Sequence, residues 1–95
     1  AVNAFSDTKT NSAALAQILS KNYSAASTTL SNIKDADAYT SYLKAIVGAR
    51  TNDTSAVINN LKDAINQKST LAKRAAKDLE FAKYFTNSDF QSLVK

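Results

Sequence analysis

The side chains best suited to chemistry in this sequence are the cations of residues 62–77, which we call the basic segment. The segment holds five cations against the single carboxylate of Asp63, an excess equal to the formal charge of +4 of the whole chain. If the segment is helical, Lys73 and Lys77 share one side with Glu80. Such a face is either a solvated surface that keeps the domain soluble or a binding surface for an acidic peptide or protein. The five cations are Lys62, Lys68, Lys73, Arg74 and Lys77.

A second set of candidate contacts lies earlier in the chain. Tyr39 and Tyr42 are three residues apart, so on a helix they lie on one side, and Arg50 follows about two turns later. Two rings and a guanidinium in this arrangement can line a groove for an extended ligand. The alternative is that the rings pack in the core with their hydroxyls reaching solvent, which the usual partial burial of tyrosine favours. We predict Tyr39, Tyr42, Arg50, Lys73 and Lys77 as the contacts of a partner.

Nucleic acid is a third class of partner for the basic segment. Single strands bind where cations alternate with exposed aromatic rings, because stacking contributes about 1–3 kcal/mol per base. The sequence offers one weak candidate of this kind, Lys83-Tyr84-Phe85. The pattern therefore disfavours a nucleic-acid partner.

The composition excludes most catalytic chemistry. Neither histidine nor cysteine is present, which removes the commonest zinc ligands, the thiol nucleophile and the usual general base at neutral pH. The carboxylates of Asp35/Asp37 and of Asp78/Glu80 are two residues apart, so they point to different sides of a helix and make poor acid–base pairs. We therefore expect no enzyme, no metal site and no cofactor. No apolar run of about 18 residues is present, so we also expect no membrane span.

Composition and patterning predict an all-α fold. The chain has no proline and one glycine, and its apolar residues recur at spacings of three and four. Its 95 residues make one domain, 1–95, and the first residue, Ala1, indicates a segment of a longer chain. Residues 1–9 are expected to be the remnant or frayed end of a preceding element. The predicted helices cover approximately residues 10–21, 23–33, 37–51, 54–67, 70–85 and 88–94.

Three of these helices carry further expectations. The helix over 37–51 is apolar around most of its circumference, so we expect it to be the buried centre, with Gly48 at a close helix crossing. The helix over 70–85 is the longest amphipathic segment, with a regular apolar stripe through Leu79. The helix over 88–94 follows a Ser-x-x-Gln capping box. Its residues Phe90 and Leu93 are expected to cover Phe81, Tyr84 and Phe85.

The helices form a partly hidden repeat. A shift of 31 residues superimposes the apolar residues of the first two helix pairs, and it places the turn residue Asn22 on Asp53. The helix over 70–85 fits the one over 37–51 better at a shift of 33, which leaves the register open. Repeats of paired helices predict a stacked array in which no pair buries its apolar face alone. The matches at 31 include Ala14 with Ala45, Ile18 with Ala49 and Leu30 with Leu61, and those at 33 include Ala38 with Leu71, Tyr42 with Ala75, Ile46 with Leu79 and Ala49 with Ala82.

Residues 10–85 resemble tetratricopeptide repeats. The resemblance rests on small residues where paired helices cross and on Tyr23 at the start of a second helix. The sequence lacks three features of the family: its tryptophan, its turn glycine and the proline between its repeats. The family's repeat is also longer, at about 34 residues. The stretches Ala13–Leu19 and Ala76–Phe85 are also similar to the C-terminal repeat region of envelope-associated proteins of Gram-negative bacteria. The small residues are Ala14, Ala26, Ala45, Gly48 and Ala64.

This resemblance implies a right-handed α-solenoid fragment of about two and a half helix pairs with a short capping helix. It also implies a non-catalytic protein-interaction scaffold, in which basic residues on the first helix of a pair hold a partner's carboxylates, in the periplasm or cell envelope of a bacterium. The alternative is a structural spacer or cap that contacts only neighbouring domains of the parent chain. An unpaired apolar surface near Val2, Ala4 and Phe5 would favour the spacer.

Overall fold

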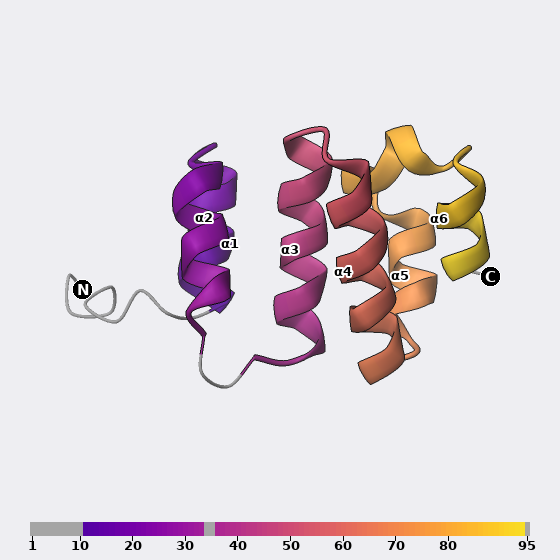
Figure 1. Ribbon diagram of the computed structural model, residues 1–95, viewed down its shortest axis with the longest axis horizontal. Helices are drawn as coiled ribbons and strands as arrows, with labels where there is room; N and C mark the ends of the chain where they lie inside the picture. The colour runs from indigo at the N-terminus through magenta and orange to yellow at the C-terminus, as the bar shows by residue number, and fades with distance from the viewer. Residues whose placement is uncertain (1–10, 34–35, 95) are drawn as a thin grey trace.

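The described part of the protein is entirely helical. The computed structural model describes residues 11–33 and 36–94, and within these ranges it contains helices and turns but no strand, which confirms the all-α prediction (Figure 1). The expectations for residues 1–9, including Val2, Ala4 and Phe5, lie outside the described residues. The helices are α1 (Asn11–Leu19), α2 (Tyr23–Ser31), α3 (Ala38–Arg50), α4 (Thr54–Gln67), α5 (Leu71–Lys77), the 3-10 helix η2 (Leu79–Tyr84) and α6 (Ser88–Leu93).

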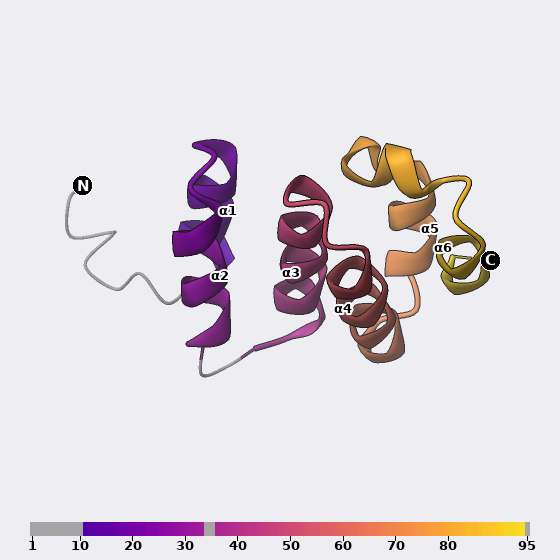
Figure 2. The ribbon, with the colours of Figure 1, turned by 45° about the horizontal axis from the view of Figure 1, so that its top comes forward.

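Antiparallel pairs of helices succeed one another along the long axis of the molecule, whose extents are 42 × 24 × 19 Å (Figure 1). The helices α1 and α2 pack on each other, as do α3 and α4, and the second pair has the most extensive contact. Helix α3 also contacts both α1 and α2. The turned view in Figure 2 shows the same succession, with α5 and α6 beside α4, while η2 contacts α3 and α5.

Helix α3 is the buried centre, as predicted. Its start is fixed by a capping box, in which the Asp37 carboxylate accepts a 3.0 Å hydrogen bond from the Thr40 N–H and the Asp37 N–H donates to the Thr40 hydroxyl. Small residues on most of its sides allow neighbouring helices to approach, so nearly all of its length is buried. The buried residues are Ala38, Thr40, Ser41, Tyr42, Leu43, Ala45, Ile46, Val47, Gly48 and Ala49.

The two turns inside the helix pairs have the same geometry. Lys21 and Asn52 both adopt left-handed backbone conformations, with φ of 64° and 62°. The next residue then donates its N–H back to the carbonyl five positions earlier, from Asn22 to Gln17 and from Asp53 to Gly48, each at 2.8 Å, as in a Schellman turn. Lys21 and Asn52 are 31 residues apart, so the shift of 31 holds for the first two pairs.

Gly48 lies where α3 and α4 cross most closely. A Cβ atom at this position would come within 3.0 Å of the Ala56 Cβ and within 3.0 Å of the Val57 backbone nitrogen. The predicted close crossing is therefore confirmed, and it involves the backbone of α4 as well as its side chains.

The prediction of one continuous helix over 70–85 is wrong. Helix α5 ends at Lys77, Asp78 is extended, and the Asp78 carboxylate accepts a 3.0 Å hydrogen bond from the Glu80 N–H to start η2. The bend turns a different set of residues toward the core: Phe81 is 0% exposed and Leu79 is 82% exposed. Burial of the larger aromatic ring in place of the leucine is the physical reason for the break. It also ends the match at a shift of 33, because Ile46 is buried whereas Leu79 is exposed.

The last helix covers two of the three aromatic residues that it was predicted to cover, Phe81 and Phe85, through Phe90. The Phe90 ring is buried, with its centroid 5.8 Å from that of Phe81 and 5.9 Å from that of Phe85. The predicted capping box is replaced, because the N-cap is Asn87, whose side chain accepts from the Phe90 N–H at 3.0 Å. The Gln91 amide instead donates to the Phe85 carbonyl.

Substitution of Gly48 tests the close crossing. Gly48→Leu should lower the free energy of unfolding by about 1–3 kcal/mol through overpacking. The smaller Gly48→Ala should also lower it, because the added Cβ meets backbone, although alanine has the higher helix propensity. Urea unfolding followed by circular dichroism measures both, with Lys73→Ala as an exposed control expected within about 0.5 kcal/mol of the wild type. A stabilising Gly48→Ala would show that the crossing has room.

Substitution of Phe81 and Leu79 distinguishes the bent from the continuous helix. Phe81→Ala should cost about 3–5 kcal/mol of unfolding free energy because it empties a fully buried site. Leu79→Ser should change stability by no more than about 0.5 kcal/mol, because that side chain is exposed. Thermal unfolding measures both changes. The reverse order of the two losses is what a continuous helix over 70–85 would give.

Candidate functional site

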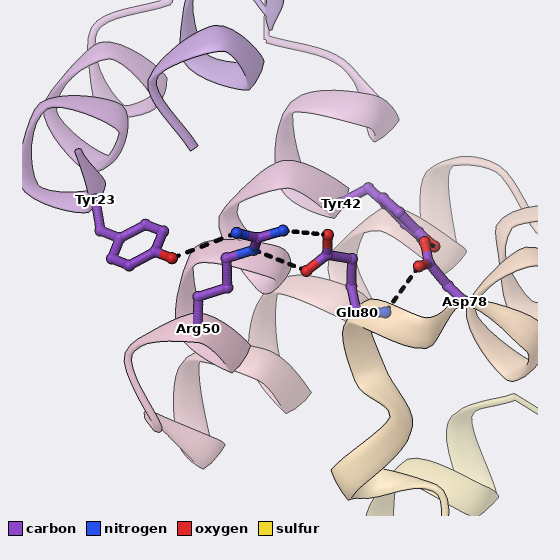
Figure 3. Close-up of polar contacts among 5 residues, drawn as sticks. All are labelled: Tyr23, Tyr42, Arg50, Asp78 and Glu80. Carbon is purple, nitrogen blue, oxygen red and sulfur yellow. Dashed lines mark hydrogen bonds and ion pairs between the residues drawn. The ribbon is translucent and has the colours of Figure 1, made fainter. Parts of the chain in front are cut away.

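A polar bridge centred on Arg50 joins three helices (Figure 3). Arg50 lies in the last turn of α3, where the negative end of the helix dipole also stabilises its positive charge. Its Nε and Nη2 atoms donate to the two carboxylate oxygens of Glu80 in η2, at 2.8 and 2.6 Å. Its Nη1 atom donates to the Tyr23 hydroxyl of α2 at 3.3 Å. Hydrogen bonds to Glu80 and Tyr23 raise the pKa of Arg50, so the bridge keeps its charge.

Asp78 makes a second connection between α3 and the bend. The Tyr42 hydroxyl donates to the Asp78 carboxylate at 2.6 Å, while the other oxygen of Asp78 caps η2 (Figure 3). Burial raises the pKa of Tyr42, and the neighbouring carboxylate raises it further, so the phenol stays protonated and donates. The Phe81 ring meets the edge of the Tyr42 ring at 5.5 Å.

These contacts change the assignment of two predicted partner contacts. The Tyr42 side chain is 0% exposed, so it has no surface for a partner, and its hydroxyl bonds to Asp78 instead of reaching solvent. The Arg50 guanidinium already holds Glu80 and Tyr23. Both residues therefore have structural roles. Sequence alone gives no signal for them, because their carboxylate partners lie 36 and 30 residues further along the chain.

Tyr39 lines a surface groove of about 470 Å³ together with Arg74 and Lys68. The Arg74 guanidinium lies over the Tyr39 ring at 5.5 Å and over the Tyr42 ring at 5.2 Å, measured to the ring centroids, within the range of a cation–π contact. Asp37 also lines the groove, but its carboxylate is used by the α3 cap, and the Thr40 N–H lowers the pKa of Asp37. The remaining lining residues are Ala38, Gln67 and Leu71.

The cations of the basic segment are exposed, and Arg74 is the one that lies over aromatic rings of the described residues. These cations make no ion pair in residues 11–33 and 36–94, where the ion pair of Arg50 with Glu80 is the one found. The nearby carboxylate of Asp63 accepts from the Ser41 hydroxyl at 2.5 Å and from the Gln67 amide at 2.9 Å. Lys73 and Lys77 are both exposed on α5, and Lys77 is three residues from Arg74, on the same side of the helix. The structure thus brings Tyr39 into contact with Arg74, one of the five cations of the basic segment.

A second groove, of about 460 Å³, crosses α3 between α2 and α4. It is lined by residues of the second helices α2 and α4 and by residues of α3. Hydroxyl and amide groups dominate its walls, with Lys44 as the only cation lining it. The polar lining residues are Tyr23, Ser24, Ser27, Ser31, Lys44, Thr51, Asp53 and Asn60.

The aromatic residues considered for nucleic-acid binding pack inside the molecule. The Tyr84 ring of the Lys83-Tyr84-Phe85 stretch is buried under the Lys83 ammonium group, and Phe85 packs on Phe90. No aromatic ring in the described part of the chain is fully exposed for base stacking.

In residues 11–33 and 36–94, no group of three or more aspartate, glutamate, histidine or cysteine side chains could hold a metal ion. Over the same ranges, no helix has the length and hydropathy needed to cross a membrane.

The Arg50 bridge predicts coupled losses of stability. Arg50→Lys keeps the charge but loses the two-pronged contact, and Glu80→Gln keeps the shape but loses the charge. Each should lower the free energy of unfolding by about 0.5–1.5 kcal/mol, because the pair is only partly buried. The double variant should lose less than the sum, since both changes remove the same contact. Fully additive losses in urea unfolding would mean that the two side chains do not act together.

The chain was compared with known proteins at the levels of family, sequence and structure. No family model, no curated protein and no solved structure matches it. The resemblance to tetratricopeptide repeats therefore stays a prediction from residues 10–85, and the geometry described above is the basis for a functional proposal.

Proposed function

We propose that this chain is a non-catalytic protein-interaction module of tetratricopeptide-like helix pairs. In this proposal, the basic segment binds an acidic segment of a partner protein. The antiparallel pairs α1/α2 and α3/α4, with the same turn 31 residues apart, support the repeat assignment. Contact of α3 with both helices of the preceding pair is also expected of a stacked array. The periplasmic or envelope location follows from the resemblance alone.

The proposal rests on a difference between the carboxylates and the cations around α5: the carboxylates have hydrogen-bond or ion-pair partners inside the molecule, and most of the cations do not. The carboxylates closest in sequence to its cations are all engaged inside the molecule: Asp63 with Ser41, Asp78 with Tyr42 and Glu80 with Arg50. The cations of the basic segment make no ion pair with a described residue, and only Arg74 among them has an internal contact, with the rings of Tyr39 and Tyr42. The local positive charge is therefore available to an external anion and raises its rate of encounter.

Arg74 is the cation best prepared for specific binding. Its guanidinium is held over the rings of Tyr39 and Tyr42, so little side-chain entropy is lost when a carboxylate binds its N–H edge. Lys68 lies on the same groove and adds a second charge. Lys73 and Lys77 are more mobile, exposed point charges, suited to attracting an acidic segment.

Charge reversal tests this function. Wild type and Lys73→Glu/Lys77→Glu are each used to capture proteins from a lysate of the source organism, at low and at moderate salt. A control variant, Lys21→Glu/Lys44→Glu, makes the same change in net charge outside the basic segment. We expect a partner that the wild type and the control retain and that the first variant loses, with weaker capture at higher salt.

Two other results would contradict the proposal. If all three proteins retain the same partner, the basic segment is not the binding surface. If none retains a partner, the structural spacer becomes the better account of the chain.

A further inference from the structure

The side chains of η2 fall into three rows by their burial and contacts, although the non-helical backbone of Phe81 (φ −107°, ψ 15°) interrupts the regular 3-10 geometry. Phe81 and Tyr84 form the inner row, and both are buried. Glu80 and Lys83 form the second row, which faces the C-terminal end of α3: Glu80 pairs with Arg50, and the Lys83 ammonium group bonds to the Asn52 side chain. Leu79 and Ala82 form the third row, which faces solvent.

No described residue covers the outer row, while the segment that carries it is held in place by its other two rows. Leu79 is 82% exposed, and both flanking rows of η2 are fixed by packing or by polar contacts. Asp78, the residue before Leu79, is fixed in addition by Tyr42. A leucine on such a segment loses little freedom when a partner binds, so most of the free energy of burying it, about 1.5–3 kcal/mol, is available for affinity.

The charges around Leu79 favour a negatively charged partner. Lys77 is two residues earlier, which limits the distance between their Cα atoms to about 7.6 Å. The two carboxylates on either side of Leu79, those of Asp78 and Glu80, are turned inward to Tyr42 and Arg50. An acidic ligand over Leu79 therefore meets lysine side chains rather than free carboxylates.

We propose that Leu79 and Ala82 form the apolar anchor of the partner-binding surface. The occupant is an acidic protein segment that places a large aliphatic or aromatic side chain on Leu79 and its carboxylates on Lys77 and Lys73. This inference rests on the proposed function and names the kind of segment recognised. A second copy of this chain fits poorly, because its charge of +4 repels the same lysines. A membrane fits poorly because one leucine and one alanine bury too little area for stable interfacial binding.

Two fluorescently labelled peptides of equal length and equal negative charge test the anchor. One carries leucine and phenylalanine between its acidic residues, and the other carries serine at those positions. Fluorescence anisotropy should show that the wild type binds the first peptide at least about tenfold more tightly than the second. Leu79→Ser should weaken the first complex to the level of the second. Leu19→Ser, at the other large exposed leucine of the described residues (66% exposed), should change neither.

The outcomes separate this inference from the function on which it rests. If Lys73→Glu/Lys77→Glu abolishes binding of both peptides but Leu79→Ser changes neither, the interaction function stands and the anchor is wrong. If neither variant changes binding, both proposals fail. Binding to phosphatidylglycerol vesicles that protects Leu79, without preference between the peptides, would assign the surface to membranes and overturn the anchor. Circular dichroism should show the same melting temperature for Leu79→Ser as for the wild type.

Discussion

The carboxylate of Asp78 determines how the C-terminal third of the chain packs. One of its oxygens starts η2 through the Glu80 N–H, and the other accepts the hydroxyl of the buried Tyr42. A buried phenol without an acceptor would cost about 1–3 kcal/mol, so this contact is needed wherever the Tyr42 ring is buried. The bend that these contacts hold lets Phe81 enter the core, leaves Leu79 exposed and leads the chain toward α6.

Helix α3 makes this arrangement geometrically feasible. Its alanines and Gly48 let α4 approach to backbone contact, while its larger side chains, such as Tyr42, face the bend. Arg50 then adds the second connection, to Glu80, at the far end of the helix. One central helix thus binds the carboxylates nearest to α5: its Ser41 and Tyr42 hydroxyls donate to Asp63 and Asp78, and Arg50 pairs with Glu80.

Features that depend on residues close together in the sequence were predicted correctly, and features that depend on residues far apart in the sequence were not. Residue type and neighbours a few positions away decide the burial of α3, the Gly48 crossing and the turns at Lys21 and Asn52, so the sequence predicts the first two helix pairs well. The bend at Asp78 escaped prediction because the apolar stripe through Leu79 fits a continuous helix equally well. The choice between Leu79 and Phe81 depends on Tyr42, which is far away in sequence. For the same reason, Tyr42 and Arg50 were taken as partner contacts although they serve the bend.

The two connections to the bend also bear on the order of folding. The turns within the pairs α1/α2 and α3/α4 need only a few residues, whereas the contacts of Tyr42 with Asp78 and of Arg50 with Glu80 close loops of 36 and 30 residues. Longer loops cost more entropy before their contacts form. We therefore expect the helix pairs to form first and the segment from α5 to α6 to dock last and open first. The surface proposed for binding would then belong to the least protected cooperative unit, where a bound partner changes amide hydrogen exchange the most.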